Sequence, residues 1–152
     1  MNSKLDIDVR QVMENQVRTK EKPELIFEDL VEGRSFKTLK YTVSKDLVRD
    51  YIETVGDHHP KYLSIAPPGL AAIYARLSYL QDHSMPSGGV LVKQEFEFKG
   101  QVRIGDTLKV RAKVASCYLD QRKRKRVNFI ITAKNQAAKP VTIVRLNIIW
   151  PK

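Results

Sequence analysis

The chain has 152 residues, 42% of them hydrophobic, and carries a formal net charge of +10. That length fits one domain, so we expect a single domain over residues 1–152 with a polar N-terminal extension of about residues 1–30. No apolar segment typical of a signal peptide is found at its start. The single cysteine, Cys117, argues against a disulfide-stapled fold and suits a reducing compartment. We therefore expect a cytoplasmic protein.

The positive charge has two interpretations. One is a polyanionic partner: a nucleic acid, a phosphate-bearing coenzyme or an acidic carrier protein. The other is a solvated basic surface with no partner. Net charge governs encounter and solubility more than it governs fold, so both interpretations stay open.

The first well-defined local elements are a strand and a helix. Alternating apolar and polar side chains over residues 35–43 predict a strand. Ser44 is a good N-cap for the helix that follows, and Gly56 supplies its left-handed C-cap. One face of this helix is apolar, formed by Leu47, Val48, Tyr51, Ile52 and Val55.

A second helix, from about Pro68 to Gln81, is predicted to be the core helix. Pro68 suits a first helical position, where its missing N–H costs nothing. Arg76 is the only charge in the interior of this segment. A helix that is apolar nearly all round is buried, and about fourteen residues is too short for a bilayer, which needs roughly 20. We expect a buried helix and no membrane contact.

From Val90 onward the hydrophobic period changes to two. Alternation runs through residues 92–98, 108–116, 127–134 and 144–150. Such alternation is typical of an antiparallel sheet with one buried face. A curved sheet of about five strands must cover that face, and only the helix at 68–81 is apolar and long enough. The predicted fold class is α+β, with the sheet wrapped around a central helix.

This order of elements is the hotdog pattern, and its motifs resemble those of the MaoC-like (R)-specific enoyl-thioester hydratases and dehydratases. The motifs are the turn Gly56-Asp57-His58-His59-Pro60, the helix start Ala66-Pro67-Pro68-Gly69-Leu70, the strand Glu95-Phe96-Glu97-Phe98 and the turn Gly105-Asp106. The resemblance covers roughly residues 30–150. It implies a lyase of fatty acid metabolism that acts, without a cofactor, on the acyl thioester of coenzyme A or of an acyl carrier protein.

The active-site pattern of that family is Asp-x-Asn-Pro-x-His, in which the Asp and the His act together. Here the Asp is Asp57, the Asn position is His59, and the His position is Tyr62. A tyrosine with a pKa near 10 is a poor base at neutral pH compared with a histidine near 6.5. Three hypotheses stay open: a hydratase in which Asp57 pairs with His58 or His59, a non-catalytic acyl-binding subunit that partners a catalytic chain, and an acyl thioesterase.

The resemblance also implies a substrate-binding role for Pro68, Gly69 and Leu70. In hotdog families this end of the central helix polarises the thioester carbonyl through its amide groups and dipole. Pro67 and Pro68 have no N–H, so the first useful donor is that of Gly69. The alternative is a buried helix start with a close backbone approach.

The run from Arg122 to Arg126 lies between two predicted strands and is therefore a hairpin tip. Arg122, Lys123 and Arg124 are candidates to bind the phosphates of coenzyme A, an acidic carrier or nucleic acid. A solvated loop is the alternative. No aromatic residue is interleaved with these charges, which argues against a nucleic-acid partner. We expect no metal site, because adjacent histidines in a turn diverge and the usual ligand spacings are missing.

Oligomeric state follows from the predicted sheet. A single hotdog sheet leaves an edge strand, which is a liability unless it is paired or covered. Pairing two sheets edge to edge would bring two central-helix N-termini close to the subunit boundary. We therefore expect a homodimer or a hotdog heterodimer.

Overall fold

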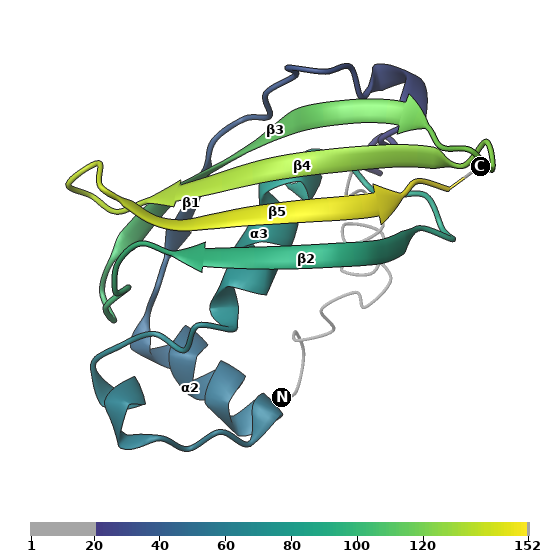
Figure 1. Ribbon diagram of the computed structural model, residues 1–152. Coiled ribbons are helices and arrows are strands. Elements are labelled where there is room, and N and C mark those ends of the chain that lie inside the picture. Colours follow the sequence, from purple (N-terminus) through teal and green to yellow (C-terminus); the bar gives the residue numbers. More distant parts are fainter. Residues whose placement is uncertain (1–20, 152) are drawn as a thin grey trace, which may run out of the picture.

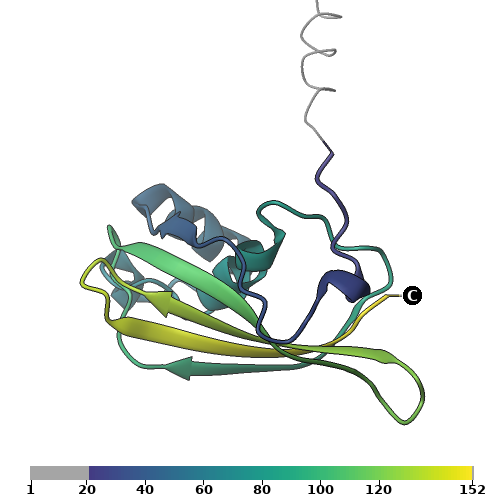
Figure 2. The same cartoon turned by 90° about the horizontal axis from the view of Figure 1, so that it is seen from above.

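The computed structural model describes residues 21–151, which form one curved sheet and the helices beside it (Figure 1). The elements are η1 (Phe27–Asp29), β1 (Leu39–Thr42), α2 (Lys45–Val55), η2 (Pro60–Leu63), α3 (Leu70–Leu80), β2 (Val90–Phe98), β3 (Thr107–Leu119), β4 (Lys125–Lys134) and β5 (Pro140–Ile149). The five strands are antiparallel, in the order β1-β3-β4-β5-β2. Figure 2 shows the curvature of the sheet and the helices on one side of it. The predicted α+β architecture is confirmed.

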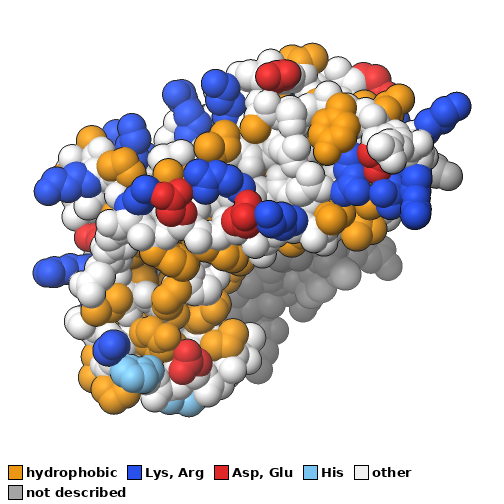
Figure 3. Space-filling view, in the orientation of Figure 1, with side chains coloured by type: hydrophobic (Ala, Val, Ile, Leu, Met, Phe, Trp, Pro, Cys, Tyr) orange, Lys and Arg blue, Asp and Glu red, His pale blue; other side chains and the backbone are white. Residues whose placement is uncertain are grey.

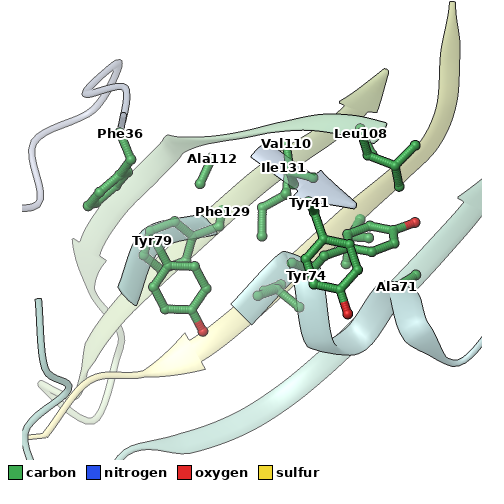
Figure 4. Close-up of a cluster of buried hydrophobic side chains, with 14 of the residues drawn as sticks. Phe36, Tyr41, Ala71, Tyr74, Tyr79, Leu108, Val110, Ala112, Phe129 and Ile131 are labelled. Carbon is green, nitrogen blue, oxygen red and sulfur yellow. The ribbon is translucent and has the colours of Figure 1, made fainter. Parts of the chain in front are cut away.

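The core lies between α3 and the concave face of the sheet. Alanines at 71 and 75 of α3 are buried, and small side chains of this kind let a helix approach a sheet closely. Larger rings fill the remaining space in pairs (Figure 4). Tyr79 stacks on Phe129 with ring centroids 4.6 Å apart, and Tyr41 meets Tyr74 edge-on at 5.5 Å. Such aromatic contacts add stability beyond the area that they bury.

The segment before β1 also belongs to the core. Leu25 and Leu30 are buried, and the indole N–H of Trp150 donates to the Leu25 carbonyl over 3.0 Å. The predicted extension therefore contains packed residues at its C-terminal end. Residues 1–20 of that extension lie outside the described residues, and its extent stays a prediction.

The predicted caps of α2 are confirmed. Ser44 Oγ accepts a hydrogen bond from the Leu47 N–H over 3.2 Å, and Gly56 adopts φ 73° after the last turn. A serine oxygen satisfies an otherwise unpaired amide at a helix start. Glycine adopts the left-handed conformation at a helix end without the strain that a Cβ would bring.

Two predicted boundaries were wrong. The central helix begins at Leu70, two residues after Pro68, although the backbone of Gly69 is already in the helical region with φ −61° and ψ −18°. The first strand begins at Leu39, and Ser35 forms only an isolated bridge with Lys113. Both differences arise at segment ends, where local propensity is weakest.

The expectation that α3 and all strands bury their apolar faces is also wrong in one region. Ile73 and Leu77 of α3 are each 41% exposed, since α3 packs mainly against β3, β5 and β1. β2 is the edge strand next to β5, and a bulge between Leu91 and Lys93 interrupts its alternation. Its exposed apolar side chains are Val90, Leu91, Val92, Phe96 and Phe98. We call these five residues with Ile73 and Leu77 the β2 apolar strip. No helix in the described part of the chain is long and apolar enough to cross a membrane.

Candidate functional site

A cavity of about 460 Å³ opens where the N-terminal end of α3 meets η2 and the β2–β3 connection. Its walls are mostly apolar, formed by Val43, Ile65, Ala66, Pro67, Pro68, Leu70, Ala71, Phe98 and Val102. The polar side chains on the wall are those of His59, Lys61, Tyr62, Tyr74, Gln101 and Thr142. A concave, mainly apolar site of this volume with a few polar groups is typical of a small-molecule site.

The turn over this cavity is fixed by backbone hydrogen bonds. Gly56 reverses the chain after α2, and η2 then begins at Pro60, whose missing N–H is tolerated at a helix start. The Ala66 N–H donates to the Val102 carbonyl over 2.8 Å, and the Ile104 N–H donates to the Ser64 carbonyl over 3.0 Å. These bonds hold the turn against the β2–β3 connection, so its side chains keep a defined orientation.

Asp57 and Tyr62 meet within this turn. The Tyr62 hydroxyl donates a hydrogen bond to Asp57 Oδ2 over 3.1 Å. Partial burial raises the pKa of Tyr62, and the hydrogen bond to Asp57 and its negative charge raise it further. Tyr62 therefore keeps its proton at neutral pH and acts as a donor. Tyr62 lines the cavity, whereas Asp57 is exposed beside it and reaches the cavity only through this hydroxyl.

The two histidines of the turn have different surroundings. His59 Nδ1 accepts a hydrogen bond from the Lys61 N–H over 3.1 Å, and its ring lies 5.8 Å from that of Tyr62. A neutral imidazole that accepts at Nδ1 carries its proton at Nε2, so His59 offers the cavity a donor. His58 is exposed and does not line the cavity. The structure thus brings His59 and Tyr62 to the cavity, and it leaves His58 outside.

The start of α3 contributes Pro68 and Leu70 to the cavity wall, but not Gly69. The Leu70 N–H donates to the Pro67 carbonyl over 3.1 Å, so it is already used. The Gly69 N–H donates to no group among residues 21–151. A Cβ at position 69 would lie 1.9 Å from the Tyr51 hydroxyl oxygen, which shows that α2 approaches this backbone closely. The thioester-binding role of Gly69 stays a prediction.

A buried hydroxyl pair in the cavity was missed from the sequence. The Tyr74 hydroxyl donates to Thr142 Oγ1 over 2.8 Å, and both residues line the cavity. Burial raises the pKa of Tyr74, so this hydroxyl keeps its proton. Tyr74 had the spacing of a core residue, and Thr142 lies on a strand 68 residues later. No sequence signal connects two residues so far apart.

The basic turn between β3 and β4 is organised around one carboxylate. Asp120 Oδ1 accepts from the backbone N–H groups of Arg122 and Arg124, and Asp120 Oδ2 accepts from the Nε of Arg124 and of Arg126. Burial alone would raise the pKa of Asp120, but these hydrogen bonds outweigh it and hold that pKa well below its usual range. Charge-assisted hydrogen bonds of this kind are among the strongest in proteins.

The predicted phosphate-binding residues are therefore unequal. Arg124 is committed to Asp120, while Arg122 and Lys123 are exposed at the tip. Figure 1 places this turn at the end of the sheet opposite α2, so it lies away from the cavity beside η2. Its phosphate-binding role stays a prediction, with Arg122 and Lys123 as the free candidates. Among residues 21–151, no three His, Cys, Asp or Glu side chains are grouped so as to hold a metal ion.

The family model described as the FAS1-like dehydratase domain region matches residues 31–143. The chain belongs to this family. The match covers β1 to β4 and the first residues of β5, up to residue 143, together with α2, η2 and α3. No curated protein matches the chain.

Solved structures of the same fold include three that bear on the family. The chain is 20% identical to a MaoC-like dehydratase from Rhodospirillum rubrum, with TM-score 0.69, covering 84% of this chain and 98% of that one. It is 21% identical to the R-hydratase PhaJ1 from Pseudomonas aeruginosa, with TM-score 0.65 and 87% of each chain covered. It is 20% identical to a chain of the HadBC (3R-hydroxyacyl-ACP dehydratase) complex from Mycobacterium tuberculosis, with TM-score 0.64, covering 78% and 96%. The resemblance to the MaoC-like hotdog family is confirmed.

Proposed function

We propose that this chain binds the acyl group of an enoyl or 3-hydroxyacyl thioester as one subunit of a hotdog hydratase or dehydratase. In this assembly a second hotdog chain supplies the imidazole that transfers the proton. The observation that carries the proposal is the tyrosine at the family's His position, whose hydroxyl donates to Asp57. Membership of a dehydratase-region family supports this class of chemistry.

The cavity supports the binding half of the proposal. Its apolar wall suits an acyl chain, because burying each CH₂ group contributes about 0.8 kcal/mol. The hydroxyl pair of Tyr74 and Thr142 adds a polar point on this wall, where a 3-hydroxyl or a carbonyl oxygen can hydrogen-bond. At the mouth, Lys61 carries a positive charge suited to the anionic carrier end of a thioester.

The lack of a suitable base among the described residues of the cavity wall supports a second chain that supplies the imidazole. Hydration of an enoyl thioester needs a base that takes a proton from water and an acid that delivers one to the α-carbon. His59 and Tyr62 both present N–H or O–H groups as donors, and the Asp57 carboxylate already accepts a hydrogen bond from the Tyr62 hydroxyl. Among residues 21–151, the cavity wall therefore offers donors but no uncommitted imidazole acceptor.

The β2 apolar strip supports a second chain. An edge strand leaves every second backbone N–H and C=O group unpaired, and exposed apolar side chains beside such an edge favour association. Figure 3 shows hydrophobic side chains gathered between the sheet and the helices below it. The similarity to a chain of the HadBC complex is consistent with pairing between hotdog chains.

A self-sufficient hydratase is the second candidate function. It is favoured by the position of Asp57, whose carboxylate is one hydrogen bond from the cavity and would be the base toward water. In that case the His59 Nε2–H would hydrogen-bond the substrate, and the proton that Asp57 takes from water would be the one delivered to the α-carbon. An acyl thioesterase, in which the same carboxylate activates water against the thioester carbonyl, is the third.

The deciding experiment measures binding and turnover of the isolated chain on crotonyl-CoA, 3-hydroxybutyryl-CoA and butyryl-CoA. Binding by calorimetry without turnover is the expected result. Turnover of the first two substrates that falls by about 10²-fold or more in Asp57→Asn would favour the second candidate. Release of free thiol from butyryl-CoA would favour the third. Neither binding nor turnover would contradict all three.

A further inference from the structure

We propose that the convex face of the sheet is a docking surface for an acidic protein, and that three lysines in one row across the sheet are its centre. Lys40 of β1 lies directly opposite Lys109 of β3, and Lys109 lies directly opposite Lys134 of β4. All three side chains are exposed, and their neighbours Tyr41, Val110 and Ala133 are buried on the helix side. The lysines therefore point away from α3, on the opposite face from the cavity wall.

The positive surface extends along β3 from this row. Arg111 and Lys113 follow Lys109 at every second position and are exposed on the same face. We call Lys40, Lys109, Arg111, Lys113 and Lys134 the convex basic patch. Figure 3 shows Lys and Arg side chains gathered over this end of the sheet, while the acidic side chains near the middle of the view lie lower, along β2.

Within residues 21–151, no member of the convex basic patch forms an ion pair. The contrast with the rest of the face is clear. On the β2 side, Lys93 pairs with Glu95, and Arg145 pairs with Glu97. At the β3–β4 turn, Arg124 and Arg126 share Asp120. Basic side chains near β2 and at the β3–β4 turn thus have carboxylate partners, whereas those of the convex basic patch have none among residues 21–151.

Holding the row together costs stability. Like charges directly opposite each other on neighbouring strands are destabilising, and Lys109 has a lysine on both sides. The cost is relieved when carboxylates are placed over the row, so an acidic partner gains affinity from the arrangement. On a surface that contacts only solvent, the repulsion between these lysines would have no compensating interaction.

The geometry favours an acidic helix over a nucleic acid as the occupant. Neighbouring strands lie about 4.7–4.9 Å apart, and acidic side chains at i and i+4 on a helix lie about 5–6 Å apart, so one helix can set a carboxylate near each lysine of the row. Stacking platforms for bases need aromatic side chains. The other side chains on this face beside the row are Thr42 of β1 and Thr132 and Ile130 of β4, and the exposed aromatic side chain on this face of β3, Tyr118, lies at the opposite end of that strand from Lys109. The proposal is independent of whether the cavity binds a thioester.

The test compares two triple variants that remove the same charge. Lys40→Gln, Lys109→Gln and Lys134→Gln remove the row, while Lys45→Gln, Arg49→Gln and Arg76→Gln remove three exposed charges on the helices. The probes are a fluorescent helical peptide with glutamates at i and i+4 spacing and a short DNA duplex, both measured by anisotropy at two salt concentrations. Thermal unfolding of each variant, followed by Trp150 fluorescence, shows whether the fold is retained.

We expect the row variant to bind the peptide on the order of tenfold or more weakly, with a melting temperature equal to or above that of the wild type. The control variant should bind the peptide like the wild type. Equal losses in both variants would show that only net charge matters and would overturn the proposal. Tighter binding of the duplex than of the peptide, lost in the row variant, would overturn the protein partner and assign a nucleic acid instead. No peptide binding by the wild type at low salt would also overturn it.

Discussion

The Tyr62 hydroxyl and Asp57 Oδ2 lie 3.1 Å apart, joined by a hydrogen bond in which the tyrosine is the donor. The short helix η2 brings the two residues together, because Tyr62 follows Pro60 by two positions and turns back toward the end of α2. Asp57 is therefore placed so that its carboxylate could orient an acid–base side chain at position 62. The Tyr62 hydroxyl itself holds its proton at neutral pH.

Tyr62→His should turn this arrangement into an acid–base pair. An imidazole at position 62 can accept a proton near neutral pH, and Asp57 can orient it, so turnover of crotonyl-CoA by the isolated chain should rise by about 10²-fold or more. The rate of hydration is measured from the decrease in absorbance of the enoyl thioester. Tyr62→Phe, which removes the hydroxyl without adding a base, should show no rise. Adding Asp57→Asn to Tyr62→His should remove most of the gain. If Tyr62→His shows no increase in turnover even at saturating crotonyl-CoA, the assignment of position 62 as the family's His position would be contradicted.

Gly69→Ala should destabilise the protein through Tyr51. The new Cβ would lie 1.9 Å from the Tyr51 hydroxyl oxygen, so the ring must move, at a cost of about 1–3 kcal/mol in the free energy of unfolding. Urea unfolding followed by Trp150 fluorescence measures it. In a Tyr51→Phe background the nearest atom is the ring carbon at 3.1 Å, and the cost should shrink. Gly100→Ala, whose Cβ would meet Val141 at an ordinary 3.8 Å, is the matched control. Equal costs at both glycines would contradict the proposed crowding.

Asp120→Asn should lower stability in a pH-dependent way. The hydrogen bonds from Arg124 and Arg126 hold the pKa of Asp120 well below its usual range. A carboxylate with a depressed folded-state pKa stabilises the fold above the unfolded-state pKa, near 4, and that stability is lost as the pH falls through the folded-state pKa. The wild type should therefore melt at a higher temperature than the variant at pH 7, with a difference that narrows below about pH 4. Asp82→Asn, at an exposed position, is the control. A difference independent of pH would show that the charge is not what matters.

Leu91→Lys should weaken association of the chain. Leu91 is an exposed member of the β2 apolar strip, and a charge there opposes burial against another sheet. Light scattering over a range of concentrations gives the molar mass. We expect the wild type to be at least a dimer and the variant to dissociate at higher concentrations than the wild type. Val31→Lys places the same charge at an exposed apolar position outside the strip. A monomeric wild type would leave only a different hotdog chain as the partner, which mixing with a candidate subunit would then test.

The sequence by itself determined the features that depend on neighbours in the chain. Ser44 and Gly56 cap α2 as predicted, because capping uses atoms a few residues away. The alternation along β3 and β4 correctly indicated which side chains are buried, since both strands have neighbours on each side and α3 covers their inner face. The turn motif around Asp57 likewise identified the family and one wall of the cavity.

Only the tertiary structure decided which residues meet across long separations. Strand order places β2 beside β5 at an edge, so the same alternation that buries Val110 leaves Phe96 exposed. The pairing of Tyr74 with Thr142 and the alignment of Lys109 with Lys134 depend on the register between distant segments. Periodicity assigns a side chain to a face, but register and strand order come from packing the whole sheet on α3. That is why the site's hydroxyl pair and the lysine row were invisible in the sequence.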